Sequence, residues 1–261
     1  MSRIYPLFSS SKGNATFVGS EKGGVLIDAG ASYKRIVQAM HDCSLEPEAI
    51  RGVFITHEHS DHVKGLHTLT KNLDVTVFGQ GKTLRNLIDS CAIHASAHIH
   101  ELNGSPVSIA DMELTAFDTP HDTEQSCGYR IVLPDGRRCA VCTDLGYITK
   151  TVDEHLMGCD LVLLEANYDE NMLRNGVYPP YVKNRIKSDR GHLSNIDSAS
   201  QIKRLIKNGT TRILLGHLSQ ENNTPALAEK TVAEALSEFI RNRDYILQVA
   251  PVETRGEVVV F

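Results

Sequence analysis

Residues 55–62 read Ile-Thr-His-Glu-His-Ser-Asp-His and directly follow an apolar run that is typical of a β-strand. His57 and His59 are two positions apart at the end of that strand, so their side chains can point the same way and bind one ion. Asp61 and His62 lie past the next turn and can face a second ion. Imidazole and carboxylate groups together suit zinc, manganese or iron, and a site with positions left for water is catalytic. This stretch therefore predicts a catalytic metal centre.

Other His and Asp residues follow apolar runs in the same way. They are Asp28 after residues 25–27, His121 after 114–117, Asp144 after 139–142 and His217 after 213–215. Because sheet proteins gather functional side chains where strands end, we expect these residues to join the same site. Each residue taken alone would favour a capping or packed core position, because capping Asp and core His are frequent, and it is their common placement that favours a function.

The remaining pattern predicts a mixture of strands and helices. Short apolar runs bounded by Gly, Asp or Pro predict strands over residues 24–28, 52–56, 74–78, 112–117, 128–133 and 211–216. Helices are expected over 33–42 and 83–91 and after the capping residues Ser194 and Thr224. The inward faces of the last two helices are expected to include Ile196 and Ile240. Since strands and helices do not alternate strictly, we expect an α/β fold of two facing sheets with helices outside.

The composition is that of an ordinary globular protein of 261 residues, with 41% hydrophobic and 23% charged side chains. The length suits one large domain or two small ones. No apolar run approaches the roughly 20 residues of a membrane-spanning helix, and the first residues lack the apolar segment of a secretory signal. Six Cys do not form a disulfide framework in a chain this long, and Cys139 and Cys142 are expected to pack on opposite faces of one strand. We expect a cytoplasmic protein that does not bind membranes.

Basic side chains are concentrated in one part of the chain. The formal net charge is −5, which argues against indiscriminate binding of nucleic acids. Residues 174–212 nevertheless contain nine basic and two acidic side chains, a net charge of +7, so the remainder carries −12. This pattern is expected where a polyanion is held at one place, although a solvated charged face would have the same composition.

Taken in chain order, these His and Asp residues resemble the five motifs of the metallo-β-lactamase superfamily. The resemblance spans residues 28–217 and implies one domain over residues 1–261, folded as an αββα sandwich with two metal ions at the edge of its sheets. It implies that the first ion is bound by His57, His59 and His121, and the second by Asp61, His62 and His217. Asp144 would bridge the two ions, and Asp28 would orient their ligands from behind. An Asp at the bridging position is similar to the hydrolases and nucleases of the superfamily, not to its antibiotic-degrading enzymes.

The segment Gly191-His192-Leu-Ser-Asn195 concerns the reaction itself, because it opens a predicted helix inside the basic part of the chain. A His at this place can donate to a leaving oxygen or to a phosphate oxygen. The layout is similar to that of the tRNA 3′-processing nucleases, which implies that His192 assists phosphodiester cleavage. Asp61 would help to orient the hydroxide that two divalent ions generate.

Several shorter segments resemble the YycJ/WalJ (VicX) family, nearly from end to end of the chain. They are Ser9-Ser-Ser-Lys-Gly13-Asn14, Leu26-Ile-Asp28-Ala-Gly30, Pro120-His121-Asp122, Glu165-Ala-Asn167, Tyr178-Pro179 and Asn222-Asn223-Thr-Pro225. The resemblance implies a bacterial cytoplasmic DNA exonuclease of 5′-to-3′ polarity, acting on single- or double-stranded DNA and linked to mismatch repair. The chain departs from the family at Ser10 and Lys12, where a Gly and a Ser are usual, and at Tyr168, where many members have His.

The basic segment, at about residues 170–195, then has an expected role. Its Lys and Arg side chains would follow a phosphate backbone without reading sequence, so RNA is a possible second substrate. Tyr178 and Tyr181 would stack on bases, or else pack within a loop. The expected substrate contacts are Asn14, Tyr181, Lys183, Arg185, Arg190 and Asn195.

Two other functions remain open. A thioester hydrolase of the glyoxalase type would use the same ions, although it normally carries a helical extension and only 44 residues follow His217 here. A non-catalytic, metal-containing DNA-binding regulator is the second, although such proteins usually lose metal ligands. Since the ligand set of this chain is intact, a DNA exonuclease is the function that we expect.

Overall fold

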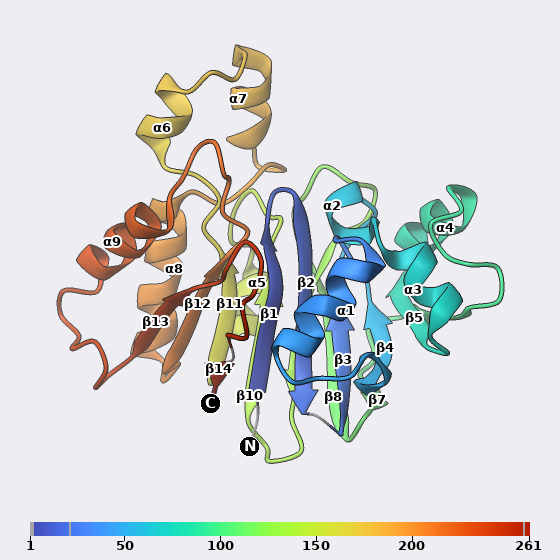
Figure 1. Ribbon diagram of the computed structural model, residues 1–261. Coiled ribbons are helices and arrows are strands. Elements are labelled where there is room, and N and C mark those ends of the chain that lie inside the picture. The colour runs from blue at the N-terminus through green and yellow to red at the C-terminus, as the bar shows by residue number, and fades with distance from the viewer. Residues whose placement is uncertain (1–2, 21, 258) are drawn as a thin grey trace.

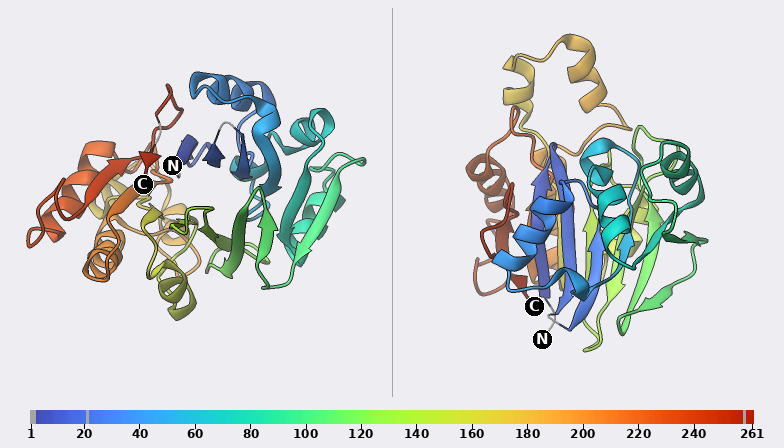
Figure 2. Two further views of the ribbon diagram at one scale, coloured as in Figure 1. Left: turned by 90° about the horizontal axis from the view of Figure 1, so that it is seen from below. Right: turned by 45° about the vertical axis from the view of Figure 1, so that its right-hand side comes forward.

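Two β-sheets face each other in the computed structural model, and helices cover their outer surfaces (Figures 1 and 2). The structure describes residues 3–20, 22–257 and 259–261. Seven strands form each sheet, and the view from below in Figure 2 shows the two sheets between outer layers of helices. The predicted αββα sandwich is confirmed.

The first sheet has the strand order β14-β1-β2-β3-β4-β5-β6. Neighbouring strands from β14 to β3 pair antiparallel, whereas those from β3 to β6 pair parallel. Their carboxyl ends therefore lie at one edge of the sheet. The bounds are β1 (Arg3–Ser10), β2 (Gly13–Ser20), β3 (Gly23–Ile27), β4 (Ile50–Phe54), β5 (Thr76–Gln80), β6 (His98–Leu102) and β14 (Val259–Val260).

The second sheet has the order β13-β12-β11-β10-β9-β8-β7. Its strands β10 to β13 pair parallel and the others antiparallel. Four carboxyl ends again meet at one edge. The bounds are β7 (Val107–Ile109), β8 (Met112–Asp118), β9 (Cys127–Val132), β10 (Arg138–Cys142), β11 (Leu161–Glu165), β12 (Arg212–Gly216) and β13 (Ile246–Val249).

The two helices with predicted capping residues begin where the sequence predicts them. Ser194 accepts a hydrogen bond from the backbone N–H of Asp197, and Thr224 accepts one from Leu227. The helices are α1 (Tyr33–Asp42), α2 (Ser60–Val63), α3 (Leu66–Asn72), α4 (Gly81–Asp89), α5 (Lys150–Leu156), α6 (Glu170–Asn175), α7 (Pro180–Ile186), α8 (Asn195–Lys207) and α9 (Pro225–Ala235), with a short 3₁₀ helix at Pro47–Ala49.

The prediction that Ile196 and Ile240 face the core is wrong. Ile196 is 54% exposed, because the buried face of α8 is formed by Ser198, Ala199 and Ile202 and by the residues one turn on. Ile240 is 52% exposed, because α9 ends at Ala235 and Ile240 therefore lies outside the helix whose inward face it was expected to join.

The core lies between the sheets and beneath the helices on either side. Because the central strands are buried on both faces, they are almost continuously apolar, as in Leu161–Glu165. Cys139 and Cys142 are fully buried in different clusters, one between the sheets and one under the helices, so they point to opposite faces of β10 as predicted.

One part of the chain stands away from this core. Figure 1 shows α6 and α7 projecting beyond the end of the sandwich, and α7 has no buried residue. We call residues 169–191, which contain these two helices, the arm. Within the described residues, none of the helices is long and apolar enough to cross a membrane.

Candidate metal centre

The seven predicted ligands and Asp28 come together at one edge of the sandwich, most of them just past the carboxyl ends of parallel strands and His121 past the end of the antiparallel strand β8. Asp28 follows β3, His57 lies just after β4, Asp144 follows β10 and His217 follows β12. Three of these residues have a left-handed backbone, with φ of 61° at Asp28, 60° at Asp144 and 54° at His217. Such conformations are uncommon outside Gly, although Asp and His are among the residues that adopt them. The chain thus turns sharply at each strand end and directs the side chain toward one place.

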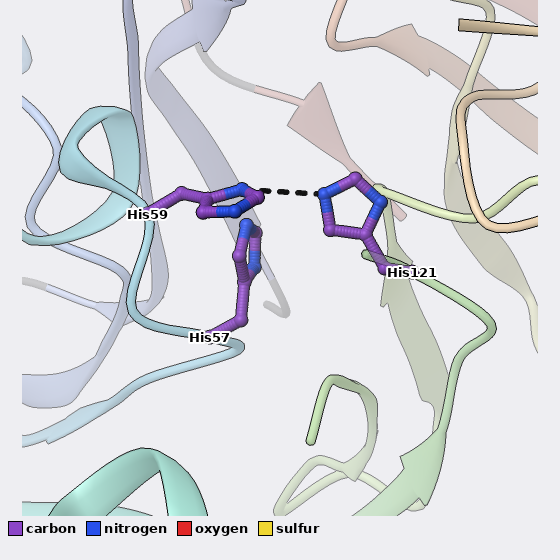
Figure 3. A group of neighbouring side chains, drawn as sticks. All are labelled: His57, His59 and His121. Carbon is purple, nitrogen blue, oxygen red and sulfur yellow. Dashed lines mark hydrogen bonds between the residues drawn. The ribbon is translucent and has the colours of Figure 1, made fainter. Parts of the chain in front are cut away.

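The first cluster consists of His57, His59 and His121 (Figure 3). Nδ1 of His59 lies 3.3 Å from Nε2 of His121, and Nε2 of His57 is buried without a hydrogen-bond partner among the described residues. The outward nitrogens are held from behind. Nδ1 of His57 lies 3.0 Å from Oγ1 of Thr56, and Nδ1 of His121 donates to the carbonyl of Gly191 at 3.0 Å. Three imidazoles therefore each present one nitrogen to a common point.

The second cluster consists of Asp61, His62 and His217. Oδ2 of Asp61 lies 3.5 Å from Nε2 of each of the two histidines. Nδ1 of His62 lies 2.7 Å from Oδ2 of Asp28, so this carboxylate contacts the ring nitrogen opposite the one that faces Asp61. Thr56 fixes Asp28 in turn through its backbone N–H and its hydroxyl, both at 2.8 Å.

Asp144 lies between the clusters. Its Oδ2 is 3.3 Å from Nε2 of His62, and its Oδ1 is 3.7 Å from Nε2 of His121 and 3.6 Å from Nδ1 of His217. Asp144 therefore reaches histidines of both clusters.

Burial and close opposite charges set the ionisation of the metal-free site. Burial disfavours charge on His217, but the carboxylates around it, Asp144 first among them, outweigh burial and raise its pKa to about 10. Burial likewise disfavours charge on Asp61, yet His62 and His217 hold the pKa of that carboxyl well below its usual range. Burial, together with the nearby His62, lowers the pKa of His57. A cation bound here would replace protons on imidazoles, so its binding would release them.

The donor set fits divalent metal cations. Nε2 of His57, Nε2 of His217 and Oδ2 of Asp144 are buried and have no hydrogen-bond partner within the described part of the chain. A buried polar atom in that state costs about 1–3 kcal/mol unless something binds it. Imidazole nitrogens and carboxylate oxygens in these numbers suit a divalent cation in each cluster.

Glu165 is a site residue whose role the sequence did not predict. It ends β11 and is fully buried, and its Oε1 lies 2.9 Å from Nδ1 of His192 and 2.6 Å from Nδ1 of His217. Its Oε2 accepts from the backbone N–H of Leu193 at 2.9 Å. Burial opposes its ionisation, but the two histidines lower its pKa to about 2. The signal was present, since a charged residue directly after an apolar strand is the pattern that identified Asp28 and Asp144.

His192 lies beside the clusters, as predicted. Its side chain is 20% exposed, and its Nδ1 is 3.7 Å from Oδ1 of Asp144. The ring centroids of His121 and His217 are 5.1 and 5.3 Å away. The imidazole thus borders the ligand residues on the side that is open to solvent.

Asn14 is buried against the second cluster. Its Nδ2 lies 3.1 Å from Nε2 of His62 and 3.4 Å from Oδ2 of Asp61. The absence of a side chain at Gly30 lets the segments of Asn14 and Asp61 come this close, since a Cβ at Gly30 would lie 1.7 Å from the carbonyl oxygen of Asp61. Asn14 therefore lies next to predicted ligands, and its reach toward a substrate remains a prediction.

The predicted contacts on the arm have different surroundings. Tyr181 is 75% exposed, whereas Lys183 donates to the carbonyl of Arg174 at 2.8 Å and so braces the arm. Arg185 pairs with Asp122, and Arg190 donates to the carbonyl of His121 at 2.8 Å. The two arginines thus tie the arm to the loop that carries a predicted ligand.

Two expectations about the basic segment need correction. Asn195 is only 1% exposed and pairs with Asn223, with 3.0 and 2.8 Å between amide nitrogens and oxygens, so its position does not suit a substrate contact. The positive charge is also less extensive than the count over residues 174–212 indicates, because the basic side chains of α8 pair with acids. These pairs are Lys203 and Lys207 with Glu238, and Arg204 with Asp153.

Residues 24–218 match the family model of the beta-lactamase superfamily domain. The chain belongs to the metallo-β-lactamase superfamily. Exodeoxyribonuclease WalJ of Streptococcus pneumoniae (strain D39) is 34% identical over 236 residues, which cover 89% of this chain and 87% of that protein. Exodeoxyribonuclease YycJ of Bacillus anthracis is 34% identical over 235 residues, which cover 89% and 88%. Within the superfamily, the chain thus belongs to the family of these two proteins.

A solved structure shows the same superfamily fold. The metallo-β-lactamase fold protein YhfI of Bacillus subtilis has a TM-score of 0.74 with this chain at 14% identity, over 99% of this chain and 98% of YhfI. The likeness therefore extends over both sheets and their helices. The predicted ligands lie far apart in the sequence but at one edge of this fold.

Proposed function

We propose that this chain is a metal-dependent exodeoxyribonuclease that hydrolyses phosphodiester bonds with two divalent cations. The observation that carries the proposal is the pair of ligand clusters, one of three histidines and one of Asp61, His62 and His217, with Asp144 between them. The named exodeoxyribonucleases WalJ and YycJ, each 34% identical over 89% of the chain, support DNA as the substrate.

The proposed ligands of the first ion are His57, His59 and His121, and those of the second are Asp61, His62 and His217, with Asp144 shared. Zinc, manganese or iron bound there would supply a nucleophile from water at neutral pH and stabilise charge that develops on the phosphate. Asp28 and Glu165 hold the outward nitrogens of His62 and His217, which directs the inward nitrogens to the ions.

Asp61 is the proposed group that orients the attacking water. Its side chain is 24% exposed, whereas the two histidines of its cluster are buried, so it lies at the solvent-facing side of that cluster. Because His62 and His217 keep the carboxyl ionised, Asp61 can accept a hydrogen bond from water.

His192 is the proposed proton donor to the leaving oxygen. Its Nδ1 faces Glu165 at 2.9 Å, which fixes the ring and leaves Nε2 for the substrate. A proton on Nε2 can then pass to the oxygen that leaves phosphorus. The ring borders the metal ligands without being one of them in this proposal.

The arm is the proposed binding surface for the nucleic acid strand. Tyr181 is exposed on α7 and is suited to stacking on a base, and Lys183 and Arg185 carry positive charge on the same helix. Such contacts hold a strand by its backbone and bases without reading its sequence, so RNA is a possible second substrate.

Further parts of the proposal rest on the sequence resemblance. They are the 5′-to-3′ polarity, the link to mismatch repair, the cytoplasmic location and the single domain over residues 1–261. A comparison of three substrates tests the proposed reaction. The wild-type protein, reconstituted with manganese or zinc, is given a DNA oligonucleotide, RNA of the same sequence and a glutathione thioester in separate reactions.

Shortening of the DNA is the expected result. Hydrolysis of the thioester alone would replace the proposal with a glyoxalase-type function. Binding of DNA without cleavage by the metal-loaded protein would indicate a non-catalytic regulator instead.

A further inference from the structure

The carboxylate of Asp122 connects the first ligand cluster with the arm. Its Oδ1 lies 3.7 Å from Nε2 of His59 and 3.4 Å from Nε2 of His121. Its Oδ2 accepts a hydrogen bond from Nε of Arg185 on α7. Oδ1 is buried and, among the described residues, has no hydrogen-bond partner. One carboxylate thus faces the ligand histidines with one oxygen and the arm with the other.

Each histidine of the first cluster has one ring nitrogen that points away from the other two histidines, and each of these outward nitrogens has a polar group near it. Thr56 lies behind His57 and the carbonyl of Gly191 lies behind His121. His59 presents Nδ1 to the cluster, so its Nε2 points outward, toward Asp122. Oδ1 of Asp122 lies 3.7 Å from this nitrogen, against 2.7 Å between Asp28 and Nδ1 of His62, and the same oxygen lies 3.4 Å from the inward Nε2 of His121.

Arg185 is placed to hold Asp122 and to meet a phosphate at the same time. Its side chain is 61% exposed, and its hydrogen bond to Asp122 uses only Nε of a guanidinium that has five donors. The same loop is held again by Arg190, which donates to the carbonyls of His121 and Thr123. The loop that carries Asp122 is therefore fixed to the arm by two arginines.

We propose that Asp122 is a positioning residue for His59 and that Arg185 acts on the first metal ion through Asp122. The arm would then do more than attract the strand, because it would also set the affinity of the first ion. The inference rests on the proposed function, since it takes His59 to be a metal ligand. Carboxylates behind ligand histidines typically change metal affinity by about 10- to 100-fold when they are replaced.

A double-mutant cycle on metal affinity tests this inference. Zinc is titrated against a chromogenic chelator in the wild type, Asp122→Asn, Arg185→Ala and the double variant. We expect Asp122→Asn to weaken one of two zinc sites by about 10- to 100-fold and Arg185→Ala to weaken the same site by at least about threefold. In the Asp122→Asn background, Arg185→Ala should have no further effect.

Two variants control for charge and for folding. Lys187→Ala removes the same charge from an exposed position on the arm and should keep both zinc affinities at the wild-type value. Arg185→Lys should restore part of the lost affinity. Thermal unfolding of the metal-free variants shows whether each still folds.

Two results would overturn the inference while leaving the proposed function intact. One is wild-type zinc affinity in Asp122→Asn, and the other is an equal effect of Arg185→Ala in both backgrounds. A wild-type protein that binds no zinc or manganese would overturn the proposed function, and this inference with it.

Discussion

Oε1 of Glu165 lies 2.6 Å from Nδ1 of His217. The same oxygen lies 2.9 Å from Nδ1 of His192, so one buried carboxylate contacts both a proposed metal ligand and the proposed proton donor. The proposed metal-binding role of His217 and the proposed proton-donating role of His192 are therefore not independent, because any movement of Glu165 changes the orientation of both rings.

Glu165→Gln should lower both metal affinity and turnover. The amide has no negative charge, and if its oxygen keeps the place of Oε1 beside the two Nδ1 groups, its NH2 group must face the N–H of Leu193, which needs an acceptor. We expect metal affinity to fall by about 10- to 100-fold, with a larger loss in turnover. Bound metal after dialysis and exonuclease rate are measured beside Glu113→Gln, an exposed position on β8. Wild-type values for Glu165→Gln would contradict the role.

His192→Ala should separate turnover from metal binding. Loss of a proton donor costs about 10²- to 10⁴-fold in rate, whereas bound metal should be unchanged because His192 is not a proposed ligand. His41→Ala, a half-exposed histidine on α1, is the matched control. Unchanged turnover would remove His192 from the mechanism, and loss of a metal ion would make it a ligand.

The stability of the metal-free protein should depend on pH through His217. The fold raises the pKa of His217 from 6.5 to about 10, with burial opposing and the nearby carboxylates favouring the charge. Its stabilising contribution is therefore complete below about pH 6.5 and is lost as pH rises through 10. Urea unfolding of the metal-free wild type should show a midpoint that falls over this range.

The same measurement on His217→Gln supplies the comparison. This variant should lose less stability between pH 6.5 and 10, because the titrating ring is absent. Equal slopes in the two proteins would show that His217 does not titrate as described.

Gly30→Ala should disrupt the second cluster. The new Cβ would lie 1.7 Å from the carbonyl oxygen of Asp61 and 2.6 Å from the backbone nitrogen of Asn14. Since both neighbours are backbone atoms, the loop that carries Asp61 must move, at a cost at or above the upper end of about 1–3 kcal/mol. Chemical unfolding and zinc stoichiometry are the measurements.

Gly209→Ala is the matched control for that variant. Gly209 has a φ of +98° but open space around it, so the substitution costs only the backbone strain, about 1–2 kcal/mol. It should leave zinc binding unchanged. A Gly30→Ala protein with full zinc binding would contradict the packing argument.

Much of the fold, and the gathering of the predicted ligand residues at one edge, could be predicted from the sequence, because both depend on short-range patterns. A ligand such as His57 or Asp144 directly follows an apolar strand, and the carboxyl ends of parallel strands meet at one edge. The helix starts at Ser194 and Thr224 follow from capping, which is a local interaction. Ile240 was wrongly placed because the end of α9 has no such local signal.

The remaining features depend on contacts between distant segments. Glu165 and His192 are 27 positions apart, and Asp122 and Arg185 are 63 apart, so no local pattern pairs them. Asn195 was expected to contact substrate, but its burial against Asn223 appears only in three dimensions. The basic count over 174–212 also includes side chains that pair with acids elsewhere in the chain.

Digestion of end-labelled DNA tests the central claim most directly. Single- and double-stranded DNA, labelled at the 5′ or the 3′ end, are incubated with protein reconstituted with manganese or zinc and resolved to single nucleotides. Asp61→Ala and His57→Ala are the controls. We predict metal-dependent, stepwise shortening from the 5′ end that is absent in both variants. Shortening of equal rate in Asp61→Ala, or no cleavage by a wild type that binds two ions, would contradict the account.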